Sequence, residues 1–276
     1  MKIMKKQIQV LFSSPIYLFS FTFLMFLFLL SIAAPLFPFS PFETDVDAIL
    51  QGPSSSHWFG TDNLGRDYFI RVLYGGRISL IVGVSAMVAS TIIGTFVGVL
   101  AGYFGGWLDN LLMRLVDILS SIPWLILVIV LSVFLRPGLT TIIVVIGCFS
   151  WMGISRLVRA ETLSVKQRDY VIYSRFIGER WWKILKRHII PNIFPTLIVA
   201  ATNSISAAIM TESALSFLGM GIQQPMSSWG SLLQTAQGDL QKAPHMAILP
   251  GLFVLLTVYS INNLGELVKN YIQREG

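Results

Sequence analysis

The amino-acid sequence predicts an all-α, polytopic membrane protein with about six transmembrane helices. Mean hydropathy is +0.70 and only 12% of the 276 residues are charged, whereas soluble domains carry about 25% charged residues. Six apolar runs each approach the roughly 20 residues that cross a bilayer as a helix. These observations exclude an ordinary soluble domain and indicate a single membrane domain.

The first span is expected at residues 16–37, after Lys2, Lys5 and Lys6 and before a proline-rich stretch. A cleaved signal peptide is the alternative, because small residues end this run. The length of the apolar run favours a span. The other spans are expected at 78–104, 112–135, 139–157, 193–218 and 246–268.

Residues 38–77 are polar and rich in Pro, Gly and Ser, and they connect the first two spans. A short helix is expected at 66–74, where Phe69, Val72 and Leu73 form one apolar stripe. Such a stripe favours a helix that lies along the outer membrane surface.

The loop at about 158–192 sets the predicted orientation. Residues 156–191 contain nine of the twenty Lys and Arg residues and three acids, a net charge of +6 (9 − 3). Lys and Arg are retained on the cytoplasmic side of membrane proteins. This loop and both termini are therefore predicted to be cytoplasmic, with residues 38–77 and 219–245 outside.

The second and fifth spans carry small and polar residues. Gly94, Gly98 and Gly102 recur at every fourth position, which lets another helix approach closely. Packing inside the bundle and a subunit interface both remain open for this ridge. In the fifth span, Asn203 and Ser206 belong to a polar face that suits a translocation path or tight helix packing.

Three acids lie within or near predicted spans, where an unpaired charge is costly. Asp117 has Arg114 three residues earlier as a possible partner. Glu266 has Lys269 nearby and is expected at the interface. Glu212 has no obvious local partner, which makes it a candidate for the translocation path.

Signatures of an enzyme are absent from the sequence. It contains no GxxxxGK[ST] phosphate loop, no HExxH and no CxxC, and its three histidines are far apart. With one cysteine, Cys148, no metal site or disulfide is expected within the chain. The localised basic charge argues against a nucleic-acid partner. A polytopic membrane enzyme and an ion-coupled carrier are the rival classes, and both lack the clustered charges that they would need.

The basic loop has an internal pattern that indicates a docking element. A helix from Ile177 onward would bring five residues to one face: Ile177, Trp181, Ile184, Leu185 and His188. This face is predicted either to rest on anionic lipid or to insert into a groove on a cytoplasmic partner. Gly178 would allow a turn before it, and Pro191 would begin the fifth span.

At these residues the chain resembles the permease subunits of ATP-binding-cassette importers. Gly178 and Pro191 keep the spacing of the cytoplasmic signature of that family, although Ile172-Tyr173-Ser174 replaces the usual Glu-Ala-Ala. Two outer segments, 57–67 and 212–230, look like those of the second permease of dipeptide, oligopeptide and nickel importers. The resemblance covers nearly the whole chain.

The resemblance implies a type I permease with residues 1–77 as an N-terminal helix plus outer segment and 78–276 as the permease domain. It implies no cofactor in this chain, and ATP and Mg in two cytoplasmic ATPases. The other implied partners are a homologous second permease and an external substrate-binding protein. The substrate would be a nickel or metal chelate, slightly favoured, or a peptide. The residues implied to couple to the ATPases are Tyr170, Val171, Arg175, Gly178, Trp181, Trp182, Leu185, His188 and Pro191.

Overall fold

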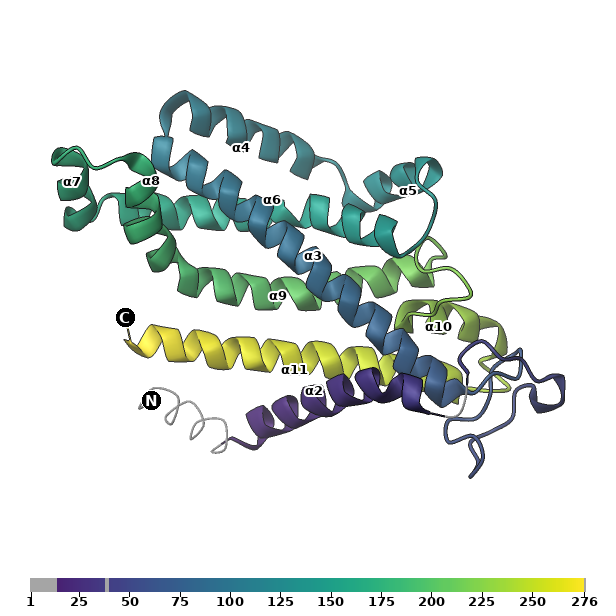
Figure 1. Ribbon diagram of the computed structural model, residues 1–276. Helices are drawn as coiled ribbons and strands as arrows, with labels where there is room; N and C mark the ends of the chain where they lie inside the picture. Colours follow the sequence, from purple (N-terminus) through teal and green to yellow (C-terminus); the bar gives the residue numbers. More distant parts are fainter. Residues whose placement is uncertain (1–13, 38–39, 276) are drawn as a thin grey trace.

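The computed structural model describes residues 14–37 and 40–275, and these residues form an all-α bundle (Figure 1). Lys2, Lys5 and Lys6, which precede the first predicted span, lie outside the described residues. The described α-helices are α2 (Pro15–Ala33), α3 (Tyr68–Phe104), α4 (Gly106–Ser121), α5 (Trp124–Phe134), α6 (Leu139–Lys166), α7 (Asp169–Phe176), α8 (Trp181–Ile184), α9 (Ile190–Phe217), α10 (Trp229–Ala236) and α11 (His245–Glu275). Short turns are η1 (Ala34–Leu36), η2 (Val46–Ala48), η3 (Leu185–Ile189) and η4 (Gln237–Asp239).

Within the described residues, five helices are long and apolar enough to cross a membrane. The fourth of these joins α8, the π-helical turn η3 and α9 into one stretch, Trp181–Phe217. The predicted all-α polytopic class is confirmed. The third predicted span, 112–135, is divided instead between α4 and α5. Pro123 lacks an N–H and Ile122 is extended, so the helix cannot continue through them.

The helix α3 begins at Tyr68, which corrects the predicted surface helix at 66–74. Asp67 caps its first turn, since the Ile70 N–H donates to Asp67 Oδ1 at 2.9 Å. Val72 is buried in a cluster with Trp229 and Met246 rather than facing lipid. The apolar stripe packs inside the protein, and the predicted domain boundary at 77/78 lies within α3.

The α3 helix crosses in front of α6 and α9 (Figure 1), and the glycine ridge is the contact with α6. A Cβ built on Gly94 would lie 2.8 Å from Trp151 O, on Gly98 2.6 Å from Ser155 O, and on Gly102 2.9 Å from Arg159 O. Of the two roles left open, the structure places the ridge in internal packing. Backbone contact this close requires glycine, because any side chain would push the two helices apart.

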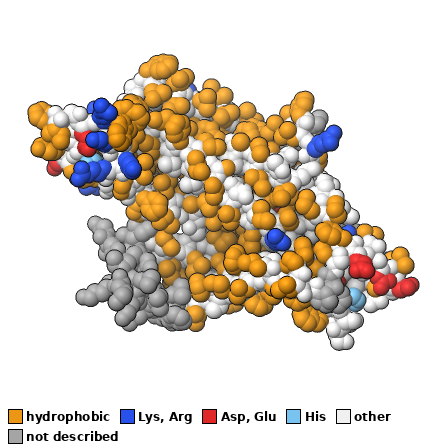
Figure 2. All heavy atoms as spheres, viewed as in Figure 1, with side chains coloured by type: hydrophobic (Ala, Val, Ile, Leu, Met, Phe, Trp, Pro, Cys, Tyr) orange, Lys and Arg blue, Asp and Glu red, His pale blue; other side chains and the backbone are white. Residues whose placement is uncertain are grey.

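The two ends of the bundle differ in charge. The α7 end carries gathered Lys and Arg side chains, and the opposite end carries the acidic side chains of the outer segment (Figure 2). The first residue of α2 and the last of α11 lie at the α7 end, whereas α10 lies at the other (Figure 1). Between the two ends, the visible face over α3 is largely hydrophobic (Figure 2).

Candidate coupling and translocation sites

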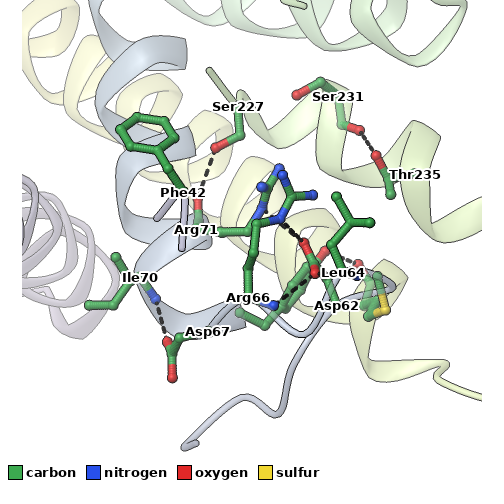
Figure 3. Close-up of polar contacts among 12 residues, drawn as sticks. Phe42, Asp62, Leu64, Arg66, Asp67, Ile70, Arg71, Ser227, Ser231 and Thr235 are labelled. Atoms are coloured by element: carbon green, nitrogen blue, oxygen red, sulfur yellow. Dashed lines mark hydrogen bonds and ion pairs between the residues drawn. The ribbon is translucent and has the colours of Figure 1, made fainter. Parts of the chain in front are cut away.

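The outer segment is held to α3 by a buried charge cluster (Figure 3). Arg66 Nε donates to Asp62 Oδ2 at 2.8 Å, and Arg71 Nε lies 3.3 Å from the same oxygen. All three side chains are at most 4% exposed. His57 Nδ1 lies 2.9 Å from Asp67 Oδ2, beside the α3 cap. These contacts fix the segment 57–67, because unpaired buried charges would be costly.

The segment 212–230 meets α3 directly beside this cluster. Trp229 is fully buried, and its Nε1–H donates to Val72 O at 3.0 Å. Ser227 Oγ donates to Arg71 O at 3.3 Å (Figure 3). Gly76 makes room for the tryptophan, since a Cβ there would lie 2.7 Å from the indole ring. The two segments that carried the family resemblance thus form one structural unit at the end of the bundle opposite α7.

Glu212 belongs to the same unit, which corrects the statement that it lacks a local partner. Ser216 Oγ, four residues later, donates to Glu212 Oε1 at 2.7 Å, and Ser79 Oγ of α3 donates to Oε2 at 3.0 Å. The Trp229 N–H in turn donates to Ser79 Oγ at 3.3 Å. Glu212 has no exposed surface. This geometry supports a structural role linking α3, α9 and α10.

The other two candidate path residues of α9 lie differently. Ser206 is buried at 5% exposure, and its hydroxyl has no hydrogen-bond partner among the described residues. Asn203 is exposed near the middle of α9 and lines two adjoining grooves of about 420 and 300 Å³. The grooves also contain polar residues of α6, α9 and α11: Glu161, Thr196, Asn262, Asn263, Glu266 and Lys269.

These grooves lie on a different face of α9 from the one that packs on α3. On α9, Ile205 and Ile209 contact Gly83 of α3, whereas Asn203 and Val199 line the grooves. At 100° per residue the two sets are centred about 120° apart around the helix. A carboxamide such as that of Asn203 is costly in hydrocarbon. This side is therefore suited to water or to another protein chain rather than lipid.

A separate cavity of about 440 Å³ lies at the break between α4 and α5. Its walls come mainly from those two helices and α6, with Thr211 from α9. Arg156 lines the cavity, and its Nη2–H donates to Asp117 Oδ1 at 2.9 Å and to Ser120 Oγ at 3.2 Å. The ion pair of Asp117 is thus with Arg156 on α6, which corrects the expected pairing with Arg114.

At the α7 end of the bundle, Gly178 ends α7 by adopting a left-handed conformation with φ +79°. The Gly178 N–H donates to Arg175 O at 3.1 Å, and the Glu179 N–H donates to Ser174 O at 3.0 Å. This is the Schellman arrangement, in which glycine avoids a Cβ clash. Gly178 therefore makes the turn between α7 and α8. Pro191 lies in the first turn of α9, as expected.

The most exposed apolar side chains of the loop lie on α7 and the residue after it. Tyr173 is 65% exposed, Phe176 87% and Ile177 60%. Tyr170 is 42% exposed and packs on the His188 ring, while Val171 is buried beneath. The surface formed by Tyr173, Phe176 and Ile177 is called the α7 knob below. Figure 2 shows apolar side chains among the basic ones at this end.

The predicted docking helix from Ile177 onward is corrected by the structure. The helix begins at Trp181, so Ile177 lies outside it. Ile184 and Leu185 are buried in the core of this chain, and Trp181 packs against Phe104 with ring centroids 5.6 Å apart. Part of the periodic face is therefore covered within this chain, while Trp181 remains 50% exposed. The remaining predicted residues of the loop, Arg175 and Trp182, are exposed.

Sequence reasoning missed two ion pairs that tie α4 to α6. Besides Asp117 and Arg156, Arg159 binds both carboxylate oxygens of Asp109 at 2.5 and 2.6 Å. The partners are 39 and 50 residues apart. The usable signal was that each charge falls in or beside an apolar run and requires a partner. Among the described residues, no group of three or more His, Cys, Asp or Glu gathers as metal ligands do.

The long apolar helices are those of a multi-pass membrane protein. Comparisons with known proteins give its class. Residues 94–275 match the family described as "Binding-protein-dependent transport system inner membrane component". The chain belongs to this family and is a permease of a binding-protein-dependent ABC importer.

Named relatives in the family transport peptides. The chain is 40% identical to a dipeptide transport system permease of Bacillus subtilis, over 88% of this chain and 77% of the relative. It is 41% identical to an oligopeptide transport system permease of Salmonella typhimurium, over 88% and 81%. A glutathione transport system permease of Escherichia coli is 42% identical, over 80% and 73%. These matches confirm the resemblance to the second permease of peptide importers.

A solved structure shares the fold. A chain of the inward-facing MetNI methionine ABC transporter superposes with a TM-score of 0.61 at 20% identity, covering 74% of this chain and 97% of that one. This supports the predicted permease architecture.

Proposed function

We propose that this chain forms half of the translocation path of an ATP-driven peptide importer and passes the motion of cytoplasmic ATPases to that path. A homologous second permease supplies the other half, and an external binding protein delivers the substrate. The ATPases supply ATP and Mg chemistry, and this chain supplies the membrane path and the contact through which they act.

The α7 knob is the observation that carries the ATPase contact. Phe176 is 87% exposed at the basic end of the molecule, on a short helix held by its glycine turn. An exposed aromatic side chain on a rigid helix is typical of a hot spot that fills a groove on a partner. The knob is also connected to the bundle, since Val171 beneath it shares a core cluster with Val158 of α6. A force on α7 is thereby transmitted to the spans.

The orientation follows from charge. The α7 end carries the basic loop, and basic loops stay cytoplasmic. The described ends of α2 and α11 lie on that side (Figure 1), which supports the proposal that both termini are cytoplasmic. The unit formed by segments 57–67 and 212–230 then faces outward, where the binding protein docks.

The substrate is assigned as a peptide, because the named relatives carry peptides and glutathione. The polar grooves between α9 and α11 fit this class, since carboxamides such as those of Asn203 and Asn262 can donate to and accept from a peptide main chain. A nickel or metal chelate is the alternative substrate, and an uptake assay that offers both kinds of substrate distinguishes them.

The coupling proposal is tested with Phe176→Asp. Placing a charge in an apolar contact should abolish co-purification of the ATPases and stimulated ATP hydrolysis, while the variant still inserts into the membrane. Phe134→Asp is the matched control: Phe134 is 79% exposed at the other end of the bundle, so its ATPase contact should be intact. Normal ATPase capture and turnover by Phe176→Asp would refute the coupling role of the knob.

A further inference from the structure

The ion pair between Asp117 and Arg156 joins α4 to α6 and is open to its surroundings. Asp117 is 11 residues beyond the start of α4 and Arg156 is 10 residues before the end of α6. At 1.5 Å per residue both lie about 15–17 Å along their helices from the α7 end. Their side chains are nevertheless 59% and 48% exposed. Charged groups on a membrane-spanning helix such as α6 must face water or protein rather than lipid.

The pair adjoins a cavity of suitable size and chemistry for a small molecule. The 440 Å³ volume falls within the roughly 300–1,000 Å³ of small-molecule sites. Arg156 and the hydroxyls of Ser120, Ser150 and Thr211 supply the polar groups. The rest of the wall is apolar, including Trp124 and Phe149. Apolar walls with few polar groups accept side chains of different shapes while orienting the charged parts.

The neighbouring pair between Asp109 and Arg159 shows what a structural link between the same helices looks like. Arg159 grips both oxygens of Asp109, which is only 12% exposed. Arg156 contacts Asp117 through one nitrogen, with both groups about half exposed. Exposed single-contact pairs contribute about 0–1 kcal/mol to stability. The pair beside the cavity is therefore readily opened.

We propose that the Asp117–Arg156 pair is a transit site for the charged termini of a peptide. The peptide carboxylate binds the Arg156 guanidinium, and the peptide ammonium binds the Asp117 carboxylate. The two side chains pair with each other again once the peptide leaves. A zwitterion suits this site because it replaces both partners at once and leaves neither charge unpaired. This inference rests on the proposed peptide importer and names the contact within its path.

The test measures protection of the cavity in the assembled complex, reconstituted in vesicles. A Cys148→Ser, Ser150→Cys chain carries one thiol on the cavity wall, where Ser150 is exposed. Dialanine and tetraalanine, tested separately, should slow labelling of this thiol by a water-soluble thiol reagent several-fold. N-acetyl-dialanine amide, which has no terminal charges, should not.

Charge variants complete the test. Arg156→Gln and Asp117→Asn should each remove the protection and lower ATP-driven uptake of the same peptides by about tenfold or more, as loss of one charge-assisted hydrogen bond predicts. Arg159→Gln is the matched control on the same helix, expected to lower thermal stability while keeping protection. Equal protection by the blocked peptide, or protection that survives both Arg156→Gln and Asp117→Asn, would overturn the inference. Absence of any peptide uptake by the unmodified complex would instead refute the proposed function.

Discussion

The close packing of α3 on α6 leads to a quantitative prediction for Gly98→Ala. The new Cβ would lie 2.6 Å from Ser155 O and 2.7 Å from Val158 Cβ. Ordinary contact begins at 3.4 Å, so the helices must separate locally by about 0.8 Å (3.4 − 2.6). Neither obstacle is the flexible end of a side chain. Overpacking of this kind costs about 1–3 kcal/mol, which outweighs the gain of up to about 1 kcal/mol from replacing a helical glycine by alanine.

Gly251→Ala in α11 is the matched control, because a Cβ there meets only Leu233 Cδ2 at 3.9 Å. This variant should be neutral or slightly stabilised by its helix propensity. Unfolding of both variants is followed by tryptophan fluorescence in mixed micelles with increasing SDS. Gly98→Ala should unfold at lower SDS than the unmodified chain, and Gly251→Ala should not. Equal midpoints for all three proteins would refute the assignment of the ridge to internal packing.

Three further predictions follow from the outer unit and the loop. Glu212→Gln should lower complex yield or thermal stability, by about 1–3 kcal/mol for a mismatched buried hydrogen bond, with uptake per assembled complex unchanged; reduced uptake at normal yield would restore Glu212 to the path. Tyr68→Phe removes the donor to Met246 O at 2.6 Å and should lower the melting temperature for the same reason, whereas an unchanged melt would contradict the bond. A proline at position 178 cannot adopt φ +79° and has no N–H to donate, so Gly178→Pro should abolish coupled ATP hydrolysis. Gly178→Ala, with open space around its Cβ, should lose less activity. Full activity of Gly178→Pro would refute the role of this turn in coupling.

Hydropathy predicted most spans well, because a long apolar run has few alternatives to crossing a bilayer as a helix. The third span was different, since its apolar content is continuous while Pro123 breaks the backbone. The start of α3 at Tyr68 was not predicted, because it lies in a polar stretch that hydropathy does not assign to a span. Arg71 looks exposed in the sequence, but it is buried by contacts with Asp62 and Ser227 that no local pattern reveals.

The coupling loop shows the limit of periodicity as a guide to function. The face that includes Ile184 and Leu185 is amphipathic in sequence whether its cover is another protein or the same chain. The structure covers it with this chain and leaves Phe176 exposed instead. Glu212 was likewise singled out as unpaired, because serine hydroxyls at positions 79 and 216 are not recognised from sequence as partners of a carboxylate.

The central claim is that this chain is an obligatory half of an ATP-driven peptide path. The most direct measurement is uptake of labelled dialanine and tetraalanine, and of nickel chelate in parallel, into vesicles that contain the partner subunits with or without this chain. The account predicts ATP-dependent peptide uptake only when this chain and the external binding protein are both present. Peptide uptake without this chain would contradict the claim, and so would uptake of nickel chelate but no peptide.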